Sequence, residues 1–125
     1  MSEAKILVVD DERNIADLIA IILQHHGYDT AACYTAAQAA KRAAECAPRL
    51  VIMDVVLPDA DGIDCALNIC RQLPDVDILV LSGQADTREL EAQIQPLKAL
   101  CPRATFLSKP VHPDDLLREI AAFGL

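Results

Sequence analysis

Five short apolar runs alternate along the 125 residues of the chain with segments whose apolar residues recur at helical spacing. The runs are Lys5 to Val9, Tyr28 to Cys33, Leu50 to Asp54, Ile78 to Leu81 and Ala104 to Leu107. The first, third and fourth are typical of strands buried on both faces, whereas the second is partly polar and fits an edge strand. Strands that alternate with helices pair in parallel through right-handed crossovers. The sequence therefore predicts an α/β fold in one domain over residues 1–125, a doubly wound five-stranded parallel sheet with five helices.

The helical segments carry their own start and stop signals. Gly27 follows the first helical segment, Thr35 can cap the second, and Pro48 ends the second. The fourth helical segment has Pro96 in its interior, where proline costs about 3 kcal/mol. We therefore expect a kink or break near Gln95, with Pro96 starting a second short turn.

Charge and cysteine content exclude several classes of function. The formal net charge of −8 repels phosphate backbones, so we expect neither nucleic acid nor a membrane surface as a partner. No apolar run approaches the roughly 20 residues of a membrane helix, and the first five residues are too short and polar for a signal peptide, so we expect a cytoplasmic protein. The five cysteines lack zinc-site spacing and are expected to be reduced core residues.

Chemically active side chains follow four of the five predicted strands. Because the carboxyl ends of parallel strands share one edge of the sheet, these side chains should meet there. They are Asp10, Asp11, Asp54, Ser82 and Lys109. Each has an ordinary explanation by itself, as a helix cap, a polar strand end, a turn serine or a solvated lysine. Their convergence favours a site, and crowded carboxylates are best neutralised by a hard cation such as Mg²⁺.

With these residues identified, the chain resembles the receiver domain of bacterial two-component response regulators. The resemblance rests on the segment from Ile6 to Glu12, on Asp54 with Pro58 and Gly62, on Ser82-Gly83, and on Lys109-Pro110. It implies the flavodoxin-like strand order 2-1-3-4-5 and a cis peptide bond between Lys109 and Pro110.

The resemblance also implies a phosphorylation reaction. Asp54 would accept a phosphoryl group from a histidine of a sensor histidine kinase or a histidine phosphotransfer protein. The Mg²⁺ ligands would be Asp11, Asp54 and the backbone carbonyl of Val56, with Asp10 assisting directly or through water. Lys109 and Ser82 would contact phosphate oxygens. Such a domain is a phosphoacceptor switch rather than an enzyme.

Further positions are expected to transmit or time the signal. In the family, movement of the serine after the fourth strand is coupled to an aromatic residue of the fifth strand, here Ser82 and Phe106. Val56 and Gln84 occupy the variable positions expected to set the rate of dephosphorylation. The fourth helix, fifth strand and fifth helix would contact a downstream protein or a second copy. The segment between Ser82 and Lys109 is longer than is usual in the family, and Val111 stands where phenylalanine is common.

Four alternatives concern what the domain is and does. It is either a stand-alone receiver or the amino-terminal part of a longer regulator with a DNA-binding or enzymatic output domain. An aspartyl phosphohydrolase would use similar chemistry, but Asp10-Asp11-Glu12-Arg13 lacks the following small hydroxyl residue such sites favour. A flavin-binding domain would share the fold, yet it needs a glycine- and hydroxyl-rich loop where this acidic run stands.

Overall fold

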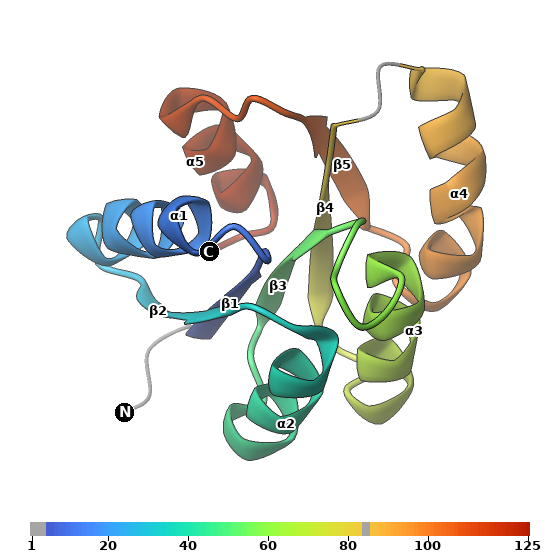
Figure 1. Ribbon diagram of the computed structural model, residues 1–125, viewed down its shortest axis with the longest axis horizontal. Helices are drawn as coiled ribbons and strands as arrows, with labels where there is room; N and C mark the ends of the chain where they lie inside the picture. The colour runs from blue at the N-terminus through green and yellow to red at the C-terminus, as the bar shows by residue number, and fades with distance from the viewer. Residues whose placement is uncertain (1–4, 84–85) are drawn as a thin grey trace.

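The computed structural model describes residues 5–83 and 86–125, and over these ranges it contains five strands that alternate with five helices (Figure 1). The strands are β1 Lys5–Val9, β2 Asp29–Cys33, β3 Leu50–Asp54, β4 Asp77–Ser82 and β5 Thr105–Ser108. The helices are α1 Arg13–His25, α2 Ala36–Cys46, α3 Gly62–Gln72, α4 Thr87–Leu100 and α5 Pro113–Ala122. All strand pairs are parallel, in the order β2-β1-β3-β4-β5. The predicted fold class and strand order are therefore confirmed.

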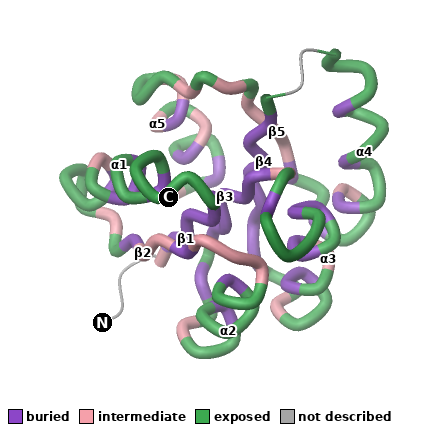
Figure 2. The backbone as a smooth tube through the Cα atoms, in the orientation of Figure 1, coloured by how far each residue is buried: buried purple, intermediate pink, exposed green. Residues whose placement is uncertain are grey.

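The sheet is covered on both faces, with α1 and α5 on one side and α2, α3 and α4 on the other (Figure 1). Successive side chains of the central strands enter opposite layers, as the pleat requires. Ile52 packs in the layer of α1 and α5, whereas Met53 packs in the layer of α2, α3 and α4, and neither is exposed. Figure 2 shows β3 and β4 as buried through their length. The polar ends of these strands are thereby fixed to a rigid scaffold.

The expected break near Gln95 and the second short turn starting at Pro96 are wrong, because the single helix α4 runs through Pro96, and only the kink stays a prediction. Proline cannot donate the hydrogen bond that a helical residue makes to the carbonyl four positions earlier, so this helix has a local cost. Its apolar face offsets that cost, since Leu90, Ile94 and Leu97 are fully buried against the sheet. Tertiary packing here overrides the local preference.

The cap of α2 and the burial of the cysteines agree with what the sequence predicts. Thr35 caps α2 by accepting a hydrogen bond from the Gln38 backbone N–H at 3.1 Å. All five cysteines lie in the described ranges and are free thiols, and all but the half-buried Cys46 are buried. Within residues 5–83 and 86–125, no helix has both the length and the apolar character needed to cross a bilayer.

Candidate functional site

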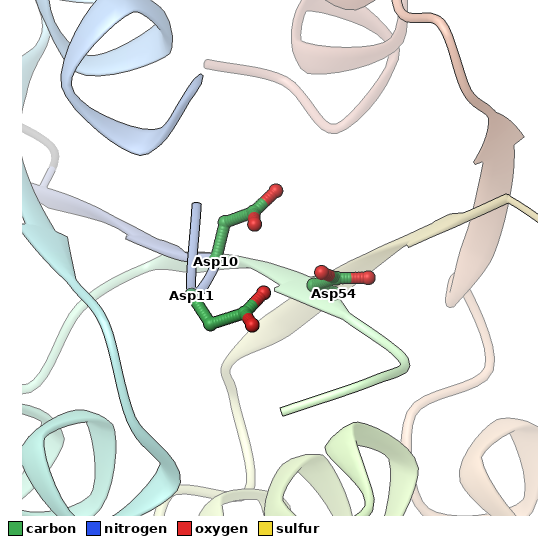
Figure 3. Close-up of side chains that lie close together, drawn as sticks. All are labelled: Asp10, Asp11 and Asp54. Atoms are coloured by element: carbon green, nitrogen blue, oxygen red, sulfur yellow. The ribbon is translucent and has the colours of Figure 1, made fainter. Parts of the chain in front are cut away.

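Three carboxylates meet at the carboxyl edge of the sheet. Asp10 and Asp11 directly follow β1, and Asp54 is the last residue of the neighbouring strand β3 (Figure 3). One oxygen from each lies within 4.8 Å of the others. Asp10 and Asp54 are buried, whereas Asp11 is exposed to solvent. The cluster is thus anchored in the protein and open on one side.

Among the described residues, Lys109 is the one cation whose side chain forms ion pairs with this cluster. Its Nζ donates hydrogen bonds to Oδ2 of Asp54 at 3.0 Å and to Oδ2 of Asp10 at 3.2 Å. The loop that carries the lysine is itself fixed, because the Lys109 backbone N–H donates to the Ser82 carbonyl at 2.8 Å. The peptide bond between Lys109 and Pro110 is cis, as the resemblance implies.

The charges at the site are unbalanced, with three carboxylates against one ammonium group. Burial raises the pKa of Asp54, and the nearby Asp10 carboxylate adds to the rise, although the Lys109 hydrogen bond opposes both. Burial would lower the pKa of Lys109, but the Asp54 and Asp10 carboxylates outweigh it and raise that pKa. The lysine stays charged, and the site retains an excess of negative charge.

Backbone donors orient the two buried carboxylates. Oδ1 of Asp10 accepts from the Glu12 backbone N–H at 3.0 Å, and Oδ1 of Asp54 accepts weakly from that of Val56 at 3.4 Å. The contact to Glu12 is a turn between a side chain and the backbone two residues on, and it does not cap α1, which has no side-chain cap. The other oxygen of each carboxylate contacts Lys109.

The loop after β3 folds tightly over the end of that strand. The Gly62 backbone N–H donates to the Val55 carbonyl at 2.7 Å, and Val56 forms an isolated bridge with Asp61. A Cβ atom placed on Gly62 would lie 1.8 Å from the carbonyl oxygen of Asp54. Only glycine permits this close approach of the two backbones.

The other predicted residues occupy different environments. Ser82 is buried at the end of β4, next to the Lys109 loop. Phe106 is half-buried in β5 and packs on the core layer of α2, α3 and α4. Val56 is 72% exposed beside Asp54. Gln84 lies outside the described residues.

Asp59 is a residue near the site that the sequence reasoning missed. Its two carboxylate oxygens accept hydrogen bonds from the backbone N–H groups of Ala36 and Ala37, at 2.8 and 3.1 Å. These bonds lower the pKa of the Asp59 carboxyl group. The contact joins the β3–α3 loop to the start of α2, and its partners are more than twenty residues apart in the sequence. No local sequence pattern predicts it.

The donor set of the site suits a hard divalent cation. All three candidate ligand groups are carboxylates, one oxygen of each lies within 4.8 Å of the others, and Asp11 is reachable from solvent. Mg²⁺ is held in proteins by one or two carboxylates with water and phosphate oxygens completing the shell. The residues present therefore fit a magnesium ion.

Sequence and structure comparisons agree with this geometry. The family model described as "Response regulator receiver domain" matches residues 6–121. The chain is 31% identical over 121 residues to "DNA-binding response regulator MtrA" of Mycobacterium leprae, covering 94% of this chain and 50% of that protein. It is 32% identical to "Regulatory protein VanR" of Enterococcus faecium, covering 94% and 48%. The chain thus spans about half the length of the curated relatives it matches.

Solved structures give the same result. A CheY-like response regulator receiver domain protein from Methanospirillum hungatei superposes with a TM-score of 0.85 at 28% identity, covering 97% of this chain and 93% of that one. Chemotaxis protein CheY4 of Vibrio cholerae gives a TM-score of 0.86 at 25% identity, covering 98% and 99%. The fold, the acidic edge of the sheet and the family match over residues 6–121 lead to one conclusion: this chain belongs to the family of response regulator receiver domains.

Proposed function

We propose that this receiver domain works as a switch that accepts one phosphoryl group on Asp54. The observation that carries the proposal is the position of Asp54, buried at the end of a central strand, near two further carboxylates and 3.0 Å from the Lys109 ammonium. A carboxylate so placed combines a nucleophilic oxygen with charges able to stabilise a transferring phosphoryl group. The domain acts as a signalling switch and not as an enzyme with a turnover reaction.

The chemical step transfers phosphorus from nitrogen to oxygen. An Asp54 carboxylate oxygen attacks the phosphorus of a phosphohistidine, a P–O bond forms, and the P–N bond breaks. Its electron pair leaves with the imidazole nitrogen, which takes up a proton. Lys109 then pairs with a phosphoryl oxygen, and Ser82 donates its hydroxyl to another. Asp10, Asp11, Asp54 and the Val56 backbone carbonyl would hold Mg²⁺, which supplies charge neutralisation for a loose transition state.

The donor is a sensor histidine kinase or a histidine phosphotransfer protein, and an apolar groove beside the site offers a place for it to dock. The groove of about 470 Å³ lies between α1 and the start of α5, and Lys109 is among its lining residues. On α1, Ile15 also lines it, and Leu18 lies there with 54% of its surface exposed. A groove of this composition suits the apolar face of a partner helix. Its continuity with Lys109 would bring the donor histidine towards Asp54.

Phosphorylation changes the surface through Ser82 and Phe106. When Ser82 turns to the phosphoryl group, the segment after β4 moves, and Phe106 changes its packing. The exposed surface of α4, β5 and α5 then binds a downstream protein or a second copy. Val56, which is exposed beside Asp54, and Gln84, at the family's other variable position, would set how long the phosphoryl group persists.

A second proposal concerns the context of the domain. The curated relatives MtrA and VanR are about twice as long as this chain, and MtrA carries "DNA-binding" in its name. We propose on this ground that the chain serves as the receiver part of a longer regulator of that type, with a stand-alone receiver as the alternative.

The proposal is tested with beryllofluoride and Mg²⁺, which together mimic the phosphorylated carboxylate. Amide NMR signals of residues 83–107 should shift in the wild-type protein, and those of Asp54→Asn should not. An unchanged wild-type spectrum on adding both reagents would contradict the proposal.

A further inference from the structure

The β3–α3 loop, residues 55–61, lies between the acidic site and the amino end of α2. Its base is closed by the hydrogen bond from Gly62 N–H to the Val55 carbonyl and by the bridge of Val56 with Asp61. Leu57 anchors the first half of the loop in the core, where it is only 7% exposed. The second half, from Pro58 to Asp61, is exposed.

Asp59 holds this exposed half of the loop against α2. Its oxygens accept from Ala36 N–H at 2.8 Å and Ala37 N–H at 3.1 Å, while the helix's own cap, Thr35, accepts from Gln38 N–H. The first N–H groups of a helix have no partner within the helix, and its dipole favours a negative charge there. Asp59 thus supplies a second cap from outside the helix.

We infer that Asp59 is a positioning residue for the metal site, because it fixes the loop that carries the Val56 backbone carbonyl. This inference rests on the proposed function, in which that carbonyl is a ligand. Magnesium tolerates little departure from octahedral geometry, so a ligand on a loosened loop binds it less well. Asp59 touches no reacting atom and acts only through Val56 and its neighbours.

The test compares Mg²⁺ binding by the metal-free protein and its variants, followed by NMR titration with the metal alone. For Asp59→Ala the dissociation constant should rise about threefold to tenfold, below the range typical of residues that directly support a metal ligand. Asp75→Ala is the matched control, since it also removes one exposed negative charge but lies in the turn before β4, at the opposite edge of the sheet. Its dissociation constant should stay within about twofold of the wild type.

A second variant tests the contact from the donor side. Ala36→Pro removes one of the two N–H groups that donate hydrogen bonds to Asp59. Position 36 is the first residue of α2, where proline is favoured. The extended backbone of Thr35 suits a following proline. Ala36→Pro should weaken Mg²⁺ binding in the wild type and have no further effect in Asp59→Ala. If Ala36→Pro acted only through a general loss of stability, it would lower the Tm, and the effects of the two substitutions would add in the double variant.

The outcomes separate the inference from the proposed function. If the wild type binds Mg²⁺ and accepts a phosphoryl group while Asp59→Ala binds Mg²⁺ within about twofold of it, this inference is overturned and the proposed function stands. If the wild type itself neither binds Mg²⁺ nor accepts a phosphoryl group, the proposed function fails, and the inference fails with it. A weakened Asp59→Ala with an unchanged Asp75→Ala supports the inference.

Discussion

The Nζ atom of Lys109 lies 3.0 Å from Oδ2 of Asp54, although the two residues are 55 positions apart in the sequence. The same ammonium group also contacts Asp10 at 3.2 Å. These contacts join the ends of β1, β3 and β5 across the carboxyl edge of the sheet. Lys109 therefore partly neutralises the carboxylates that we propose to bind Mg²⁺.

Replacement of Lys109 by methionine should destabilise the metal-free protein. It keeps much of the apolar stem but leaves Asp10 and Asp54 buried without this counter-charge. We expect the free energy of unfolding to fall by about 3 kcal/mol, the low end for a broken buried pair, because the lysine side chain is 23% exposed. Urea denaturation measures it, and Mg²⁺ should restore part of the loss.

Lys98→Met provides the control for this change. Lys98 pairs with Glu91 on the surface, and the two side chains are 35% and 49% exposed. A pair of this kind contributes less than about 1 kcal/mol. Equal losses in the two variants would show that the Lys109 contacts have no special energetic role.

Asp54→Asn should stabilise the metal-free protein at neutral pH. Burial raises the pKa of Asp54, so folding disfavours its ionised form, and the wild type loses stability as pH rises through that raised pKa. Asparagine avoids this loss while its side-chain oxygen can still accept from Lys109. The stability gain should be full above the raised pKa and should shrink as pH falls towards the ordinary value of 3.8. Thermal melts across this pH range measure it, and a wild type more stable than the variant at neutral pH would refute the prediction.

Gly62→Ala should distort the proposed phosphorylation site. The added methyl group would lie 1.8 Å from the Asp54 carbonyl oxygen, so the backbone of the loop or strand must move. We expect a loss of about 3 kcal/mol, the upper end for overpacking, together with slower phosphoryl uptake. At Gly83 a Cβ meets no atom within 4 Å, which makes Gly83→Ala the stability control. Equal stability of the two variants in denaturant titrations would count against the close approach.

Pro96→Ala should stabilise the protein by about 1 to 3 kcal/mol, because alanine restores a helical hydrogen bond, although the unfolded chain gains some freedom. Pro113 stands in the first turn of α5, where the missing N–H has no helical partner, so Pro113→Ala should change stability little. Chemical denaturation of both variants tests this difference. A destabilised Pro96→Ala would mean that α4 requires the proline.

Local patterns in the sequence were sufficient to predict most of the fold. The apolar runs ending at Val9, Asp54 and Leu81 are fully or almost fully buried strands, because continuous apolar segments of this length are stable only inside a sheet. The predicted break at Pro96 was wrong, because the local rule for proline does not include the burial of Leu90, Ile94 and Leu97. The stabilisation gained by burying this apolar face of α4 depends on the rest of the core and cannot be predicted from the sequence of the helix alone.

The site was predictable to the extent that topology determines it. Once strands are parallel, Asp10, Asp54 and Lys109 must converge, and the structure brings them within hydrogen-bonding distance. Asp59 was not predictable in this way, because its partners Ala36 and Ala37 are backbone groups of a distant helix. Contacts from a loop to a helix end depend on the exact path of the chain, and residue type carries little information about them.

The most direct test of the central claim is the stoichiometry of phosphorylation with acetyl phosphate and Mg²⁺, measured by intact-protein mass spectrometry. We predict one hydroxylamine-sensitive phosphoryl group per wild-type chain, none on Asp54→Asn, and none on the wild type when the metal is chelated. An Asp54→Asn protein that takes up the same phosphoryl group would contradict the account, as would a wild type that takes up none.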